Sequence, residues 1–157
     1  MADKQIIGQL ISLLTQANAH VTFEDAVQSI PFEILDEKPA NLPYSIWMLV
    51  EHIRIAQADI LEFCINENYK TLKWPGEYWP LEEFPLNETD WLKSLEQIRK
   101  DRDNFIALLS KSGADLLSPF PHAEGQNLFR EALLIADHTS YHTGQIILVR
   151  RLLNDWP

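Results

Sequence analysis

His138 and His142, near the C-terminus of the 157-residue chain, are the residues whose type and spacing most directly suggest chemistry. In a helix, residues four apart lie on the same face, with Cβ atoms roughly 5–6 Å apart. Two imidazoles in this relation can bind one metal ion, as the paired histidines of zinc-protease helices do. The spacing therefore makes His138 and His142 candidate metal ligands.

The two histidines also occupy the centre of a largely apolar helical seam. Residues that repeat every seven positions form two adjacent rows, Leu128, Ile135, His142, Val149 and Trp156 in one and Glu131, His138, Gln145 and Leu152 in the other. Such a stripe is typical of a helix that faces a core. Because burial of a polar group costs free energy unless the group is bonded, the imidazoles need partners. A metal ion is one interpretation, and hydrogen bonds to the backbone, Tyr141 or Gln145 are the other.

A third histidine, His52, lies beside the apolar stripe of another expected helix. From there it can reach a groove shared with His138 and His142, which would give a three-histidine site. Neutral imidazoles suit zinc, nickel, copper or iron(II), and three protein ligands with an open fourth position are typical of catalytic zinc. The alternative is a half-exposed His52 without a ligand role. His20 and His122 fall in connecting segments, where we expect them to be solvated.

Four segments with helical spacing of apolar residues must position these histidines. They cover residues 3–18, 44–66, 88–111 and 127–154. Asn87 or Thr89 can cap the third helix and Gly113 can end it, while Asn127 can cap the fourth helix. No stretch shows the two-residue alternation that is typical of strands. We therefore expect an all-α chain, a single domain over residues 1–157 that folds as a four-helix bundle.

Two connections, residues 19–43 and 67–87, are longer than the about 2–8 residues that usually join antiparallel helices, so they permit crossovers. The second contains Lys73-Trp-Pro-Gly-Glu-Tyr-Trp-Pro80 and then Phe84-Pro85. Its prolines disfavour regular helix, and its aromatic side chains offer large apolar surfaces. We expect this segment either to cover one end of the bundle or to form a lid or wall of a substrate pocket.

The charge balance excludes several classes of partner. The formal net charge is −10, so the chain lacks the basic face that nucleic acids and anionic membrane surfaces require. No apolar run approaches the ~20 residues of a membrane span, and no signal peptide is evident. A lone cysteine, Cys64, suits a reducing cytoplasm and is expected to be a small core side chain. Small molecules, metal ions and a second copy of the chain are the expected partners.

Two further positions stand out in the predicted helices. Arg102 interrupts the apolar face of the third helix, which is expected to comprise Leu92, Leu95, Ile98, Phe105, Ile106 and Leu109. It either pairs with Glu131 or Asp59 inside the bundle or holds a substrate carboxylate. Gly144 either permits close approach of a neighbouring helix or packs as an ordinary helix residue.

His138-x-x-x-His142-x-Gly144-Gln145, together with His52, resembles the DinB/YfiT-like superfamily of metal-dependent enzymes. The likeness covers nearly the whole chain, in length, in helix pattern and in the order of the three histidines. It implies a four-helix bundle with long crossover connections and up-down-down-up topology, commonly a homodimer. It also implies that His52, His138 and His142 hold a divalent metal ion, with zinc or nickel favoured and iron or manganese as alternatives.

The same resemblance implies a range of activities. Characterised members include transferases that use bacillithiol, mycothiol or glutathione, and a maleylpyruvate isomerase. Since a metal ion deprotonates a thiol that it binds, the favoured function is metal-dependent transfer of a low-molecular-weight thiol cosubstrate to a small electrophilic substrate. A metal-dependent hydrolase and a non-catalytic, metal-binding dimeric scaffold are the alternatives. Gln145 is expected to orient a ligand histidine or a bound water, or else only to form a hydrogen bond in the core.

Overall fold

The computed structural model describes residues 2–81, 87–111 and 115–156. Its elements are α1 (Ala2–Thr15), α2 (Phe23–Val27), α3 (Ile46–Ile65), α4 (Glu88–Ser110) and α5 (Leu128–Leu152), with 3₁₀ turns η1 (Phe32–Ile34) and η2 (Gly76–Tyr78). Within these described ranges there is no β-strand, so the predicted all-α fold is confirmed. In the same ranges, no helix has both the length and the apolar character that crossing a membrane demands.

The four predicted helices correspond to α1, α3, α4 and α5, and their ends lie within three residues of the predicted bounds. Asn87 caps α4 as predicted, because its side chain accepts a hydrogen bond from the backbone N–H of Asp90. Asn127 caps α5 in the same way, through the N–H of Arg130. Both caps satisfy backbone donors that have no partner inside the first turn. Gly113, the predicted end of the third helix, lies outside the described residues.

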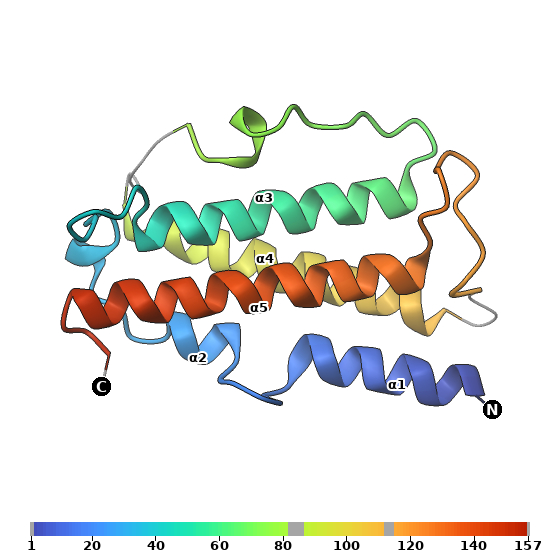
Figure 1. Cartoon of the computed structure of the whole chain (residues 1–157), viewed down its shortest axis with the longest axis horizontal. Coiled ribbons are helices and arrows are strands. Elements are labelled where there is room, and N and C mark those ends of the chain that lie inside the picture. Colours follow the sequence, from blue (N-terminus) through green and yellow to red (C-terminus); the bar gives the residue numbers. More distant parts are fainter. Residues whose placement is uncertain (1, 82–86, 112–114, 157) are drawn as a thin grey trace.

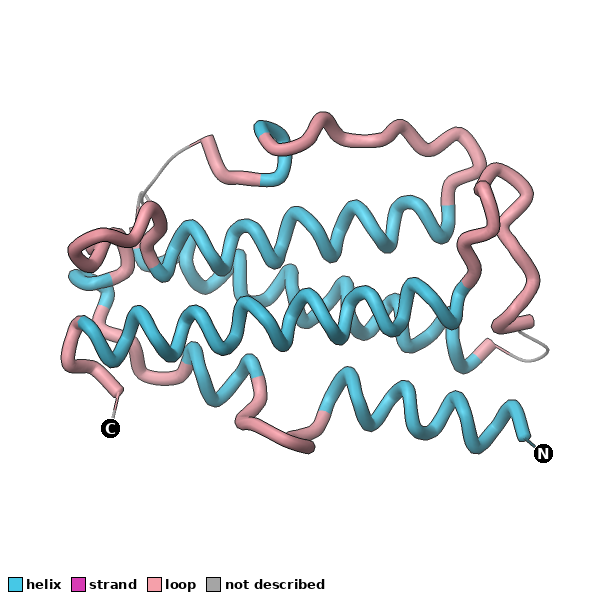
Figure 2. The backbone as a smooth tube through the Cα atoms, viewed as in Figure 1, coloured by secondary structure: helices cyan, strands magenta, loops and turns pink. Residues whose placement is uncertain are grey.

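The four long helices lie side by side (Figure 1). α3 packs against both α4 and α5, and α1 packs against α4 and α5. Figure 1 shows α3 and α4 running in one direction and α1 and α5 in the other. The chain must therefore return along α3 before α4 begins, and Figure 2 shows this connection as an extended loop interrupted by η2.

The connection between α1 and α3 contains α2, a short helix that the sequence pattern did not predict. Thr22 and Asp25 form a capping box, in which the Thr22 side chain accepts from the Asp25 N–H and the Asp25 carboxylate accepts from the Thr22 N–H. Phe23, Ala26 and Val27 are buried, and α2 packs against α5. This long connection is therefore anchored to the bundle by its own apolar residues.

Two apolar clusters form the core. The first includes Ile46, Leu49, Val50, Ile53, Ile98 and Ile146, and the second includes Leu10, Phe105, Leu109, Ala132 and Ile135. The predicted inward position of Leu92 is wrong, because Leu92 is 61% exposed and its neighbour Trp91 is 8% exposed. Neighbouring residues differ by about 100° around a helix, so one of the two must face outward. Cys64 packs against the second cluster, and burial raises the pKa of its thiol to about 12.

Arg102 pairs with a residue that the sequence did not suggest. Its Nη1 lies 2.7 Å from Oε1 of Glu24 in α2, so the predicted pairing with Glu131 or Asp59 is wrong. Glu131 pairs instead with Arg130, and Asp59 accepts hydrogen bonds from two tyrosines. The error follows from the unpredicted α2, since that helix brings Glu24 next to α4.

Candidate metal centre

Three histidines from two helices meet between α3 and α5. His52 comes from α3, and His138 and His142 come from successive turns of α5. The ring centroids are 4.8 Å apart for His52 and His138, 4.6 Å for His52 and His142, and 4.4 Å for His138 and His142. One ligand nitrogen from each ring lies within 4.8 Å of the other two. The structure thus brings together the three side chains that the sequence analysis selected.

The cluster is shielded from water. His52 is 3% exposed and His142 is 6% exposed, while His138 is half-buried. Because burial disfavours the charged imidazolium, it lowers the pKa of His138 to about 3 and that of His142 to about 4. Burial also lowers the pKa of His52, and the neighbouring imidazoles add to the effect at His138 and His142. The three rings are therefore neutral at pH 7, which is the form that binds a metal ion.

Tyr78 and Trp79, from the connection between α3 and α4, hold the ring of His52. Nδ1 of His52 lies 2.6 Å from the carbonyl oxygen of Tyr78, and since a carbonyl only accepts, Nδ1 carries the proton. Trp79 stacks on the same ring, with centroids 4.3 Å apart and planes 7° apart. Nε2 of His52 is consequently unprotonated, and it accepts the hydrogen bond from Nε2 of His138 at 3.1 Å. Phe84 and Pro85, which belong to the same predicted cover or lid, lie outside the described residues.

Asp59 anchors the segment that carries Tyr78. Its carboxylate accepts hydrogen bonds from the hydroxyl of Tyr78 at 2.7 Å and from the hydroxyl of Tyr69 at 2.8 Å. Burial and the hydrogen bond to Asp59 raise the pKa of Tyr78, so its hydroxyl remains a donor. Tyr78 is thus bound to α3 twice, through its hydroxyl at Asp59 and through its carbonyl at His52. The segment therefore lies against His52 through Tyr78 and Trp79, and its role as a lid or wall of a substrate pocket stays a prediction.

Gln145 fixes the ring of His142. Its Oε1 lies 2.6 Å from Nδ1 of His142, and its amide donates to the hydroxyls of Tyr44 at 3.1 Å and Tyr141 at 3.3 Å. Because the amide nitrogen is the donor to both tyrosines, the amide oxygen is the acceptor, and Nδ1 of His142 carries the proton. Nε2 of His142 is therefore unprotonated. The predicted contact between Gln145 and a clustered histidine is present.

The arrangement fits a metal ion. Two nitrogens bound to zinc at about 2.0–2.1 Å in tetrahedral geometry lie about 3.3 Å apart. The Nε2 atoms of His52 and His138 are 3.1 Å apart, close to that separation. Both His52 and His142 hold their proton on Nδ1, away from the cluster, so their Nε2 lone pairs are available. Three neutral imidazoles suit zinc, nickel, copper or iron(II), and they leave one position of a tetrahedral ion to water or a substrate atom.

The other two histidines lie outside the cluster. His20 is exposed, as expected, and its Nε2 is 2.7 Å from the Ser140 hydroxyl. His122 is half-buried, and its Nε2 donates to the carbonyl of Phe63 at 2.9 Å. The ring of His122 also packs on Phe63 and Phe120. The prediction that His122 is solvated is therefore wrong, because this connection folds onto the aromatic end of α3.

Gly144 and two residues that the sequence analysis did not select lie on the helices and connections that carry the histidines. A Cβ placed on Gly144 would meet no atom within 4 Å, so the suggestion that it permits close approach of a helix is wrong. Tyr44 and Asp59 take part in the hydrogen bonds that orient the histidines, and the sequence analysis gave neither this role. Their sequence signal is only proximity, since Tyr44 lies eight residues before His52 and Asp59 lies seven residues after it.

The family model of the DinB superfamily matches residues 17–146, which is more than half of the chain. The matched region includes His52, His138 and His142, and it extends from just after α1 into α5. Comparison with curated proteins and with solved structures finds no match. The all-helical fold and the cluster of three histidines agree with this family and are compatible with metal binding. The chain belongs to the DinB superfamily.

Proposed function

We propose that His52, His138 and His142 bind a divalent metal ion and that the protein is a metal-dependent enzyme acting on a small molecule. The observation that carries this proposal is the convergence of three shielded, neutral imidazoles, with ligand nitrogens all within 4.8 Å of one another. Membership of the DinB superfamily supports such a site. Zinc and nickel are the favoured ions, with iron and manganese as alternatives.

The residues around the cluster prepare the imidazoles for this role. The carbonyl of Tyr78 and the amide of Gln145 each accept the Nδ1 proton of one histidine. Such outer hydrogen bonds fix the tautomer, orient the ring and raise its basicity as a ligand. Trp79 covers one face of His52, and the apolar ring limits access of water from that side. The site therefore needs little reorganisation to receive an ion.

The reaction that we favour is transfer of a low-molecular-weight thiol to a small electrophile. His52, His138 and His142 would hold a divalent ion, which would supply the positive charge that favours the thiolate, the nucleophilic form of a thiol. In the transfer, the sulfur forms a bond to the electrophilic carbon, and the leaving group departs with the electrons of the broken bond. The thiol proton passes to solvent.

Elemental analysis of two histidine variants tests the metal site. After loading with zinc, His138→Ala should retain far less metal than the wild-type protein, because it loses one of three ligands. His122→Ala is the matched control, since His122 is a half-buried histidine outside the cluster, and it should load like the wild type. Equal zinc contents in the two variants would exclude the proposed ligand set.

Turnover assays test the reaction. Metal-loaded protein is mixed with 1-chloro-2,4-dinitrobenzene and with bacillithiol, mycothiol or glutathione in turn, with and without EDTA. Metal-dependent conjugation with one thiol supports the transferase. Release of nitrophenol from a nitrophenyl ester without any thiol would indicate the alternative hydrolase. Absence of both activities, with a lower melting temperature after chelation, would indicate a metal-binding scaffold and would overturn the proposal of an enzyme.

We extend the proposal to a cytoplasmic homodimer, which the resemblance to the superfamily implies. The single cysteine, Cys64, is compatible with a reducing compartment, because one cysteine cannot form a disulfide within the chain. Light scattering of the purified protein at micromolar concentration measures the mass in solution. A mass of one chain over the whole concentration range would contradict the dimer.

A further inference from the structure

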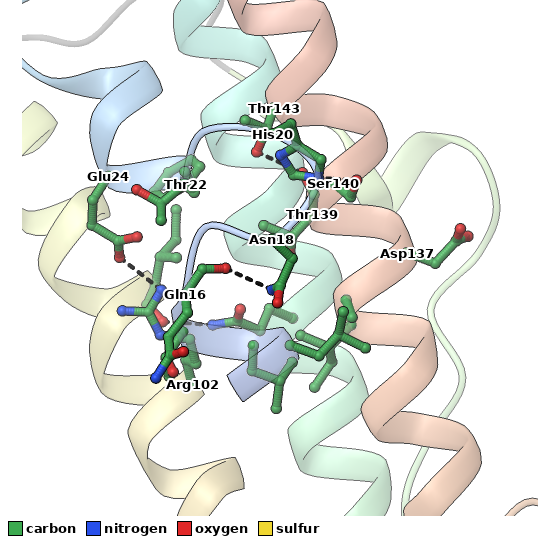
Figure 3. A pocket seen from close by; sticks show the side chains of 18 of the residues that line it. Gln16, Asn18, His20, Thr22, Glu24, Arg102, Asp137, Thr139, Ser140 and Thr143 are labelled. Carbon is green, nitrogen blue, oxygen red and sulfur yellow. Dashed lines mark hydrogen bonds and ion pairs between the residues drawn. The ribbon is translucent and has the colours of Figure 1, made fainter. Parts of the chain in front are cut away.

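A cavity lies on a different face of α5 from the histidine cluster. Its volume is about 520 Å³, within the range of about 300–1,000 Å³ that small-molecule pockets usually have. Figure 3 shows that residues of the connection between α1 and α2 close it against α4 and α5. None of the three clustered histidines lines this cavity, so it is separate from the candidate metal centre.

Part of the cavity wall is apolar. The apolar side chains come from four helices and include Leu14, Phe23, Ile98, Ile135 and Ala136. Leu13 and Leu133, which also line the cavity, are 44% and 41% exposed. Since removal of apolar surface from water is favourable, an apolar group that enters the cavity and covers these leucines would be stabilised there.

Arg102 and Glu24 are the charged residues whose side chains face one another in the wall, whereas the carboxylate of Asp137, which also lines the cavity, points away from them (Figure 3). Nη1 of Arg102 and Oε1 of Glu24 form an ion pair at 2.7 Å (Figure 3). The side chain of Arg102 is 16% exposed and that of Glu24 is 32% exposed, so the pair is not sealed off by the surrounding protein. The guanidinium and the carboxylate therefore offer a ligand a donor and an acceptor side by side.

Several other polar groups of the cavity already have partners in the protein. Gln57 donates to the carbonyl of Ile98 at 2.6 Å, Thr143 donates to that of Thr139 at 2.7 Å, Asn18 donates to that of Gln16 at 2.9 Å, and Ser140 lies 2.7 Å from Nε2 of His20. Arg102 and Glu24 are thus the groups best placed to select a polar ligand.

We infer that this cavity binds a small, uncharged amphipathic molecule, with its apolar chain against the leucines and an amide-like head group between Arg102 and Glu24. A carboxamide matches the pair, because its oxygen can accept from the guanidinium of Arg102 while its N–H donates to the carboxylate of Glu24. Charge favours the same choice. The positive charge of Arg102 and the negative charge of Glu24 cancel, so a carboxylate head group would leave a net negative charge in a partly buried site.

Titration calorimetry with octanamide, in EDTA so that no metal site contributes, tests the cavity. Wild-type protein should bind octanamide with a one-to-one stoichiometry. Ala136→Phe should weaken binding at least tenfold because the ring fills the cavity. Ala107→Phe places the same ring on an exposed position of α4 outside the cavity and should bind as the wild type does. Absence of binding to the wild type, or equal binding to the two variants, overturns the inference.

The choice of head group is tested by comparing octanamide with octanoate. The wild type should prefer octanamide by about tenfold, because a carboxylate beside Glu24 is repelled. Glu24→Gln keeps the shape of the side chain and removes its charge, so this variant should reverse the preference toward octanoate. Circular dichroism establishes that each variant is folded. If the ratio of the two affinities is the same in the wild type and in Glu24→Gln, the assignment of the head group is wrong.

Discussion

Replacement of Gln145 by leucine isolates the contribution of one hydrogen bond to metal binding. In the wild type, Nδ1 of His142 lies 2.6 Å from Oε1 of Gln145 and donates its proton to that oxygen. Leucine has a similar volume but no acceptor. The N–H of a ring that is 6% exposed then has no partner, which costs about 1–3 kcal/mol. The ring can avoid that cost by rotating or by moving its proton to Nε2, and either change removes the lone pair that faces the cluster.

The expected loss of metal affinity can be worked out from the cost of the lost hydrogen bond. Loss of an outer hydrogen-bond partner lowers metal affinity about 10–100-fold, and each factor of ten corresponds to about 1.4 kcal/mol of binding free energy. We therefore expect Gln145→Leu to raise the zinc Kd by roughly one to two orders of magnitude. This loss of binding free energy is similar to the cost of leaving the N–H of His142 without a partner. Gln145→Glu should have the opposite effect, since a carboxylate acceptor increases the basicity of the imidazole.

Competition titration against a chromophoric zinc chelator at pH 7.5 measures these affinities. Tyr141→Phe is the matched control, because it removes a hydroxyl that contacts Gln145 at 3.3 Å from a position that is 63% exposed. Its zinc Kd should stay close to that of the wild type. A zinc Kd for Gln145→Leu that equals the wild-type value would refute the role of Gln145 in orienting His142.

Three further outcomes are expected. In EDTA, the free energy of unfolding should fall by at least about 2 kcal/mol between pH 7 and pH 5. The pKa of His142 is about 4 in the folded chain and about 6.5 in the unfolded chain, so the unfolded chain takes up the proton first, and this residue alone accounts for about 2 kcal/mol. Burial of His138, whose pKa is about 3, adds to the loss. Urea denaturation at each pH checks this, and a flat profile would contradict it. Tyr78→Phe should weaken zinc binding more than Tyr69→Phe, since the carbonyl of Tyr78 contacts His52. Equal zinc affinities would show that the hydrogen bond between Tyr78 and Asp59 does not affect the metal site. Phe105→Ala, at a position that is 0% exposed, should cost about 3–5 kcal/mol of stability. Leu92→Ala, at a position that is 61% exposed, should cost no more than about 0.5 kcal/mol by the same measurement.

The long helices could be predicted from the sequence because their burial is periodic over several turns. Leu10 and Phe105 belong to stripes whose spacing is visible without any knowledge of their partners. α2 has five residues, which is little more than one turn, so its apolar residues show no periodicity. The pairing of Arg102 with Glu24 depends on where α2 lies, and it could not be predicted for the same reason.

The candidate site, too, could be predicted from the sequence only in part. His138 and His142 are neighbours on one helix, so their spacing alone places them on one face. The hydrogen bonds that orient the rings join distant positions, since Tyr78 and Asp59 are 19 residues apart and Gln145 and Tyr44 are 101 residues apart. No local pattern encodes such pairs. They arise from the path of the connections, which depends on the packing of the whole bundle.

The stacking of Trp79 on His52 gives the chain an intrinsic optical reporter. An indole in van der Waals contact with an imidazole, at 4.3 Å between centroids, emits differently when that imidazole becomes protonated or binds a paramagnetic ion such as nickel(II). Emission intensity should therefore follow the protonation and metal occupancy of His52 in real time, with no added label. Trp79→Phe removes the signal and leaves the emission of the other indoles as the baseline.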